Sequence, residues 1–224
     1  MVDRPRRAAP LPPGERRTAI LRDVRPVLLE RGAGVTTKEL AQAAGVAEGT
    51  LFRVFEDKNA LVRAAVIAAV DPATDVPALA AVDIDAPLEV RVRAVLEIGL
   101  ERMGHVMQWM GILHEVARAA GEPVGPGAHL GWREHAERQQ RGQQEVRDAI
   151  VVLLAPDAAR FAQPVDVTVD LLTLTVGGLA MSLIDARRRG VEPSVPPLGV
   201  VVDHFLHGAL VPADAPSAPS EGNR

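Results

Sequence analysis

Two short helical patterns separated by only three residues constrain this chain more than any other feature. The first begins at a capping box, in which the Thr36 hydroxyl and the Glu39 carboxylate can each bond a free amide at the helix start. It ends at Gly45, and the second pattern starts after Ala47 and carries apolar side chains through Phe55. Because glycine tolerates the turn and small residues let two helices cross closely, we expect a helix-turn-helix.

Helical periodicity continues on both sides of this motif. Residues 15–31 place apolar side chains on one face, and Pro26 removes a backbone donor inside that segment, which predicts a kink or a split. We expect Asp57 to cap a further helix over residues 58–70. Residues 1–14 hold four prolines and three arginines, and they predict a flexible basic arm.

The rest of the chain is a series of longer helical segments. No segment alternates like a strand between hairpin turns, so the predicted fold class is all-α. Gly190 and the arginines before it are typical of a helix end. After a Pro-, Ala- and Asp-rich connection over residues 72–87, we expect helices over residues 88–103, 105–120, 132–154, 165–189 and 198–210. The predicted divisions are an arm (1–14), a helix-turn-helix domain (15–62), a helical body (63–211) and a disordered tail (212–224).

Composition narrows the classes of function. Apolar residues make up 47% of the chain, which is enough for a sizeable core. The absence of cysteine excludes disulfides, thiolate metal sites and a cysteine nucleophile. The N-terminus lacks the apolar stretch of a secretory signal, and the most apolar stretch, residues 171–184, is shorter than the ~20 residues that cross a bilayer. We therefore expect a cytoplasmic protein without a membrane span.

Charge is divided unevenly along the chain. Residues 1–70 carry a net charge of +4 and residues 71–224 a net charge of −8, within a total of −4. A basic front suits an anionic partner, although an excess of four charges is small.

The helix-turn-helix segment resembles the DNA-binding domain of the TetR family of bacterial transcriptional regulators. The resemblance is confined to the N-terminal part, and the remainder is similar to the family only in the order of its helices. The matching residues are Arg17-Thr18-Ala19-Ile20-Leu21, Glu30-Arg31-Gly32, Thr36-Thr37-Lys38-Glu39-Leu40-Ala41, Ala44-Gly45-Val46-Ala47, Gly49-Thr50-Leu51-Phe52-Arg53-Val54-Phe55 and Asp57-Lys58 with Leu61.

The resemblance implies a three-helix DNA-binding domain whose recognition helix, residues 48–55, enters the major groove of an operator. Thr50 and Arg53 would reach base edges or phosphates, and Gly49 would let the helix backbone approach the DNA closely. Lysines and threonines at helix starts would contact phosphates. The predicted DNA contacts are Thr37, Lys38, Glu48, Gly49, Thr50, Phe52, Arg53 and Lys58.

Three positions depart from the family pattern. Phe52 stands where the family often has a tyrosine, so the ring remains but the donor to a phosphate is lost. Glu48 stands where a cation or a small residue is common; it would repel phosphates and can instead accept a hydrogen bond from a cytosine amino group. Ala47 replaces the usual serine, which leaves the recognition helix without a side-chain cap. The operator of a relative therefore does not transfer to this chain.

The resemblance also implies that the C-terminal helical domain binds a small molecule. Methionine and aromatic side chains concentrate near residues 103–114, and methionine suits pockets that accept several shapes. We expect a small apolar or aromatic effector, with an ordinary core as the alternative interpretation of the same residues. The predicted ligand contacts are Met103, Met107, Trp109, Met110, Leu113, His114, Trp132 and Met181.

Dimerisation is the second function that the resemblance implies for this domain. Residues 165–184 are more continuously apolar than one helix face can bury within one subunit, and their small residues permit close helix approach. Together with the last helix they predict a four-helix interface across a two-fold axis, with an intramolecular core helix as the alternative. The predicted interface residues are Leu174, Gly177, Gly178, Met181, Val201 and Phe205.

Catalytic and metal-binding patterns do not emerge from the sequence. His114-Glu115 is followed by Arg118 rather than by a second histidine, and no phosphate loop, nucleophile elbow or dinucleotide fingerprint is present. Asp203, His204 and His207 lie one turn apart but lack a further ligand at an evident spacing, so a helix-end interface is favoured over a metal site. We expect no enzyme, no cofactor and no bound metal.

The sequence as a whole predicts a homodimeric, ligand-responsive repressor that leaves a palindromic operator when its effector binds. Its partners would be operator DNA, a small-molecule effector and a second copy of the chain. The alternative is a helical small-molecule-binding dimer without sequence-specific DNA binding, which Glu48, Phe52 and the low basicity favour.

Overall fold

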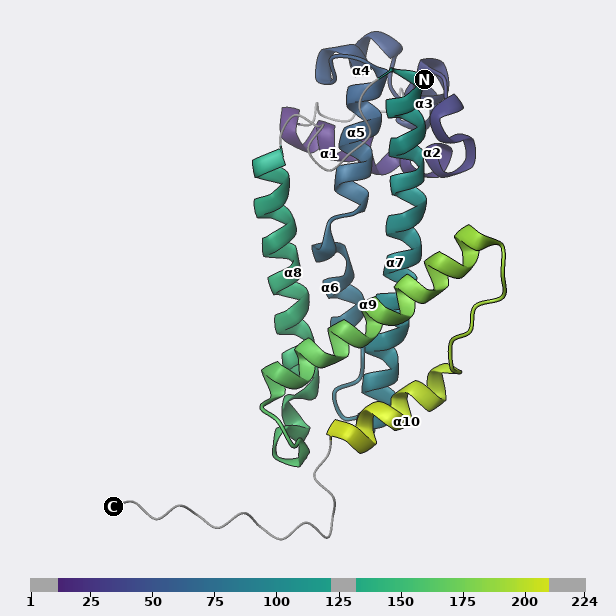
Figure 1. Cartoon of the computed structure of the whole chain (residues 1–224). Coiled ribbons are helices and arrows are strands. Elements are labelled where there is room, and N and C mark those ends of the chain that lie inside the picture. Colours follow the sequence, from purple (N-terminus) through teal and green to yellow (C-terminus); the bar gives the residue numbers. More distant parts are fainter. Residues whose placement is uncertain (1–11, 122–131, 210–224) are drawn as a thin grey trace, which may run out of the picture. The chain divides into compact units, whose positions relative to one another are not determined.

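The computed structural model describes residues 12–121 and 132–209, and Figure 1 shows helices throughout these ranges. No extended strand occurs among the described residues, so the predicted all-α class is confirmed. The predicted tail and nearly all of the predicted arm lie outside the described residues. The chain divides into an N-terminal unit, which comprises residues up to 71 and residues 105–136, and a C-terminal unit, which comprises residues 72–104 and those from 137 onward.

The N-terminal unit begins with α1 (Pro13–Asp23) and α2 (Arg25–Arg31). The predicted split is confirmed, because the helix breaks at Val24 and Pro26 takes a place in the first turn of α2. Helix α1 starts at Pro13, inside the predicted arm. A proline at the first helical position loses no hydrogen bond, so four prolines did not exclude a helix there.

The motif follows as η1 (Gly32–Gly34), α3 (Thr37–Ala43), α4 (Glu48–Val54) and α5 (Lys58–Ala69). The predicted cap of α5 is confirmed, because the Asp57 carboxylate accepts from the Ala60 amide at 2.6 Å. The predicted boundary after residue 62 falls within α5, and the whole of this helix belongs to the N-terminal unit. The unit's core is apolar and includes Ile20, Val24, Leu28, Leu40, Leu51, Phe55, Leu61, Val62, Trp109, Ile112, Leu113 and Val116.

The C-terminal unit contains η2 (Pro72–Asp75), α6 (Val76–Ala80), η3 (Ala155–Arg160), α9 (Val165–Arg189) and α10 (Leu198–Ala209), with parts of α7 (Leu88–Ala119) and α8 (Trp132–Leu154). The bounds of α8 and α9 match the predictions, and Gly190 ends α9 in the left-handed conformation. Two short helices, η2 and α6, lie in the segment predicted as a connection, because Pro72 and Pro77 open helical turns rather than interrupting them.

The prediction of two helices between residues 88 and 120 is wrong. The sequence predicted two helices over residues 88–103 and 105–120, but α7 is a single helix of 32 residues. A glycine inside a helix costs only about 1 kcal/mol, and apolar side chains are buried on both sides of Gly104, so packing overrides the local preference.

A buried arginine joins α7 to the end of α8 within the C-terminal unit. The Arg91 guanidinium, only 4% exposed, donates to the carbonyls of Ala86 and Leu153 and pairs with Asp157. Burial raises the pKa of Asp157, but hydrogen bonds from Arg160 and Arg91 outweigh this effect, so the net pKa lies below its ordinary value. Buried charges persist only where they are paired in this way.

Candidate nucleic-acid interface

The start of α3 is fixed by the predicted capping box, which is confirmed in full. The Thr36 side chain accepts from the Glu39 amide at 3.2 Å, and the Glu39 carboxylate accepts from the Thr36 amide at 2.8 Å. The Thr36 hydroxyl also donates to the Glu39 carboxylate at 2.8 Å, and the bonds from the Thr36 amide and hydroxyl lower the pKa of Glu39. The first amides of α3 are therefore satisfied by hydrogen bonds.

The turn between α3 and α4 uses a glycine where a side chain would be strained. Gly45 has φ of +63°, in the left-handed region that glycine adopts without cost. The Val46 amide donates to the Ala41 carbonyl at 3.0 Å, which closes the helix end. The predicted helix-turn-helix is present with its glycine at the turn.

One side of helix α4 is buried in the core of the N-terminal unit, and the other side is exposed to solvent. Leu51 is buried in the core, and Phe55, the residue at its C-terminal cap, is buried beside it. The guanidinium of Arg17 on α1 lies 4.5 Å from the centre of the Phe55 ring, a cation–π contact that sequence reasoning did not foresee. The exposed side of α4 carries four of the predicted DNA contacts, Glu48, Gly49, Phe52 and Arg53, and Thr50 is half-buried.

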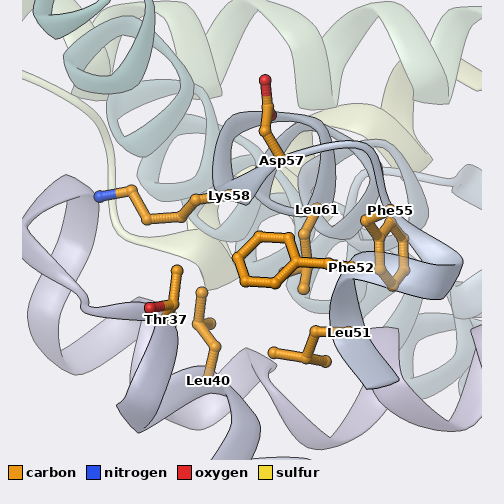
Figure 2. Close-up of a pocket in the computed structure, with 8 residues that line it drawn as sticks. All are labelled: Thr37, Leu40, Leu51, Phe52, Phe55, Asp57, Lys58 and Leu61. Carbon is orange, nitrogen blue, oxygen red and sulfur yellow. The ribbon is translucent and has the colours of Figure 1, made fainter. Parts of the chain in front are cut away.

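Phe52 is the large apolar residue on this exposed side. It is 47% exposed although it is a phenylalanine. Figure 2 shows its ring in the middle of the side chains that line a small cavity, with Lys58 and Thr37 to one side and Leu51 and Leu61 to the other. The cavity holds about 10 Å³, which is space for one water molecule, and it is too small for an effector.

Gly49 meets no heavy atom within 4 Å of the place where a Cβ would stand. Nothing inside the described part of the chain therefore requires glycine at this position.

Two predicted phosphate contacts have partners inside the protein. The Thr37 hydroxyl donates to the Glu48 carboxylate at 3.0 Å, which links the first residues of α3 and α4. The Lys58 ammonium donates to the carbonyls of Ala33 and Val35 at 3.2 and 3.1 Å. Since an ammonium has three protons, Lys58 keeps one for a phosphate, whereas the Thr37 hydroxyl has none left. Lys38 is exposed on the first turn of α3.

The η1 turn is also held from α7, by a contact that sequence reasoning missed. The Ala33 amide donates to the Glu115 carboxylate at 3.4 Å, and the same carboxylate lies 3.0 Å from where a Cβ of Gly32 would stand. Gly32 has φ of +57°, a backbone conformation in which a side chain would be strained. The partners are 82 positions apart in the sequence, so no local sequence signal exists for this bond.

The predicted ligand contacts are divided between the two units. Trp109 and Leu113 are buried in the core of the N-terminal unit and Met110 packs against it, whereas Met107 and His114 are exposed. In the C-terminal unit, Met103 is half-buried and Met181 is 65% exposed. Trp132 begins α8, and its side chain lies outside what the structure describes. Their role in binding stays a prediction.

A shallow surface hollow along α8, in the C-terminal unit, was not predicted. It has a volume of about 400 Å³ and is widely open to solvent. The sequence signal was the run rich in glutamine and arginine at the start of α8, whose polar residues recur on one helix face. The lining residues are Glu137, Gln140, Arg141 and Gln144.

The predicted dimer residues fall into two groups. On α9, Leu174 is 70% exposed, Met181 and Gly178 are exposed, and Gly177 is half-buried. On α10, Val201 and Phe205 are half-buried and pack against the core of the C-terminal unit. A Cβ added at either glycine would meet nothing within 4 Å, so no other helix among the described residues packs closely against these two glycines.

Helix α9 is long and apolar enough to cross a membrane by length and composition alone. Its other face is bound into the C-terminal unit: Val169 and Leu172 are fully buried in the core, and Asp170 accepts from Arg147 of α8 at 2.9 Å. The helix is therefore a packed element with one apolar side uncovered.

Among residues 12–121 and 132–209, no three His, Cys, Asp or Glu side chains lie close enough together to hold a metal ion. On α10, the His207 ring lies 3.3 Å from the Asp203 carboxylate, and both are exposed.

The geometry of the N-terminal unit defines a class of protein. Its α4 is fixed through buried side chains, follows a glycine turn and presents an exposed side, as the second helix of a DNA-binding helix-turn-helix does. DNA-binding transcriptional regulation is the function associated with this fold.

Comparison with known proteins names the family. Residues 20–65 match the sequence model described as bacterial regulatory proteins, tetR family, so this segment is similar to the DNA-binding domain of that family. A search of curated proteins finds no match to the chain.

Solved structures share the fold along almost the whole chain. A protein from Vibrio parahaemolyticus named as a TetR-family regulator is 19% identical, with a TM-score of 0.52 over 88% of this chain and 99% of that one. NemR from E. coli is 17% identical, with a TM-score of 0.52 over 88% and 100%. A transcriptional regulator from Saccharomonospora viridis, solved with choline, is 17% identical, with a TM-score of 0.55 over 89% and 100%. At these identities the likeness concerns the fold alone.

Proposed function

We propose that this chain is a ligand-responsive transcriptional regulator, a cytoplasmic homodimeric repressor that a small apolar or aromatic molecule releases from a palindromic operator. The observation that carries the proposal is the exposed side of α4. Gly49, Phe52 and Arg53 are exposed to solvent there, while Leu51 on the opposite side is buried in the core. An arginine and a glycine on the solvent side of a recognition helix suit contact with phosphates and base edges.

Dimerisation is supported by the uncovered apolar row on α9. Val167, Leu171, Leu174 and Met181 are all exposed, with Gly178 between the last two, and they recur every three or four residues. Such a row lies on one helix face, and monomeric proteins seldom leave a large contiguous apolar surface in water. A second copy related by a two-fold axis would cover it and would carry a second recognition helix.

Effector binding is proposed for the helical body. One solved protein of this fold is named in complex with choline, which supports a small-molecule role for such a body. The methionine and tryptophan side chains of α7 favour an apolar or aromatic effector.

The bond from Glu115 on α7 to η1 offers a physical connection to the DNA-binding motif. A ligand that displaces the C-terminal half of α7 would pull on the Ala33 amide, and η1 leads directly into α3. Two recognition helices fit two half-sites at only one separation, so a small displacement would weaken operator binding.

Selection of bound sequences from random duplex DNA tests the proposal, with the Arg53→Ala variant as the matched control. We expect the full chain to recover a two-fold symmetric site and the variant to lose affinity for it. Binding that is sensitive to salt but blind to sequence would contradict the proposal. It would favour a second candidate, a helical small-molecule-binding dimer without sequence-specific DNA binding, to which Glu48 and Phe52 on the exposed side of α4 point.

A further inference from the structure

The carboxylate on the exposed side of α4 has a fixed position. Glu48 opens α4, and its side chain is exposed to solvent. One of its oxygens accepts from the Thr37 hydroxyl at 3.0 Å, and Thr37 is the first residue of α3, which the capping box at Thr36 holds in place. Among the described residues no cation pairs with Glu48, so its charge stays available at the surface that faces DNA.

A carboxylate in the major groove is selective because it can only accept hydrogen bonds. Guanine presents two acceptors there, and thymine presents an acceptor and a methyl group, so both repel or exclude it. Adenine presents its amino donor beside the N7 acceptor. Cytosine presents an amino donor without a neighbouring acceptor on the same base, and it is the base that glutamate reads.

Thr37 decides where this carboxylate points. Its single hydroxyl proton is used in the bond to Glu48, so Thr37 cannot donate to a phosphate while that bond exists. A side chain that is already oriented loses less rotational freedom on binding than a free glutamate would. The contact between α3 and α4 thus orients the carboxylate in the free protein.

We propose that Glu48 reads one cytosine in each half of the operator and that Thr37 is the positioning residue for its carboxylate. This inference rests on the proposed function and adds a base specificity to it. It replaces the predicted phosphate contact of Thr37 with an indirect role in base readout. A purely structural role for Glu48, as an acidic residue in the first turn of α4, would leave base preference unchanged on its removal.

Selection from random duplex DNA, with full-length chains, separates these roles. We expect the wild-type chain to select a C·G pair at one symmetric position in each half-site. Glu48→Ala would accept all four base pairs at that position and keep its preferences elsewhere. Thr37→Val would weaken the same preference, and Thr37→Ser, which keeps the hydroxyl, would restore it.

A second test combines a change in the DNA base with the Glu48→Ala substitution, as in a double-mutant cycle. The cytosine is replaced by an analogue that lacks the 4-amino group, and the affinity is measured for the wild-type and Glu48→Ala chains. We expect the wild-type chain to lose roughly 5- to 150-fold in affinity, the discrimination that one good side chain–base contact gives. Glu48→Ala should lose almost nothing, and unchanged melting temperatures would show that both chains are folded.

The outcomes distinguish this inference from the proposed function. If the wild-type chain selects a symmetric site and Glu48→Ala selects the same site with every preference intact, the readout by Glu48 is wrong and the regulator remains. If the wild-type chain selects no symmetric site, the proposed function fails and the base readout fails with it.

Discussion

Two lysines at helix starts, both predicted as phosphate contacts, have different surroundings in the folded chain. Lys58 was predicted as a phosphate contact from its place at a helix start, yet its ammonium bonds the carbonyls of Ala33 and Val35, 25 and 23 residues away. Lys38 is exposed on the first turn of α3. Sequence spacing placed both at helix starts correctly, but only the folded turn of η1 brings carbonyl oxygens to Lys58.

Substituting each lysine by methionine separates a structural from a DNA-binding role. Lys58→Met should lower the free energy of unfolding by about 2 kcal/mol, because two carbonyls lose a charged donor. Lys38→Met should change stability by less than about 0.5 kcal/mol. It should reduce the salt slope of operator binding by about 2, one phosphate in each copy of a dimer. Urea unfolding and affinity titrations over a range of salt measure both, and equal stability loss in the two variants would contradict the assignment.

The paired carboxylate of Asp157 predicts a dependence of stability on pH. Although burial raises its pKa, the bonds from Arg160 and Arg91 lower it below the ordinary value of 3.8. A group with a lowered folded pKa stabilises the protein above its unfolded pKa and loses that contribution as pH falls through the folded pKa. We expect Asp157→Asn to destabilise the chain by about 3 kcal/mol at neutral pH, because Arg91 stays buried without its partner.

Melting temperatures measured between pH 7 and pH 2 test whether the stabilisation by Asp157 depends on pH as expected. The difference between the wild-type and Asp157→Asn chains should shrink below about pH 4, where Asp157 of the unfolded chain begins to take up a proton, and it should keep shrinking as pH falls through the lower pKa of the folded chain. A difference that stays constant down to pH 2 would show that the ion pair is not the source of the stabilisation.

At the scale of the helical element, two glycines of α7 have opposite surroundings. A Cβ at Gly99 would lie 2.8 Å from Cγ1 of Val176 on α9, whereas a Cβ at Gly104 would meet nothing within 4 Å. The valine is branched at Cβ and cannot easily turn away. Gly99 is therefore a contact point between α7 and α9 in the C-terminal unit, and Gly104 is not a contact point.

Alanine at each position should change stability in opposite directions. Gly104→Ala should stabilise the chain by about 1 kcal/mol through helix propensity. Gly99→Ala should destabilise it by about 1–3 kcal/mol, because the added methyl overpacks the contact with Val176. Thermal unfolding of both variants measures this, and stabilisation by Gly99→Ala would show that the helices separate at no cost.

The uncovered row on α9 predicts an oligomeric state that single substitutions can change. Leu174 is 70% exposed on α9 and Val152 is 62% exposed on α8, so glutamate at either position disturbs the isolated chain little. Leu174→Glu should convert a dimer to a monomer, because it places a charge in an apolar interface. Val152→Glu serves as the control and should remain dimeric. Sedimentation velocity distinguishes them, and a dimeric Leu174→Glu would exclude this face from the interface.

Much of the fold could be predicted from the sequence, and what was missed has a physical pattern. Strong local signals predicted the capping box at Thr36, the turn at Gly45, the split at Pro26 and the end of α9 at Gly190. The single helix α7 was missed, because burial on both sides of Gly104 overrides a weak local breaker. Contacts between distant residues, such as that between Glu115 and Ala33, leave no local pattern at all.

At the scale of the whole molecule, the chain combines a segment similar to TetR-family DNA-binding domains with a helical body that leaves one apolar face of α9 uncovered. The family match covers residues 20–65, and the fold of solved relatives extends over most of the chain. We propose that two copies of the chain bind one two-fold symmetric operator.

The most direct measurement compares the selected operator with the same duplex in which one half-site is scrambled. Affinity and the mass of the complex are measured together at a fixed salt concentration. The account predicts two chains on the intact duplex and a loss of affinity of at least about 100-fold on the scrambled one, since each wrong base pair costs about 1–3 kcal/mol. Equal affinity for the two duplexes, or one chain on the intact site, would contradict it.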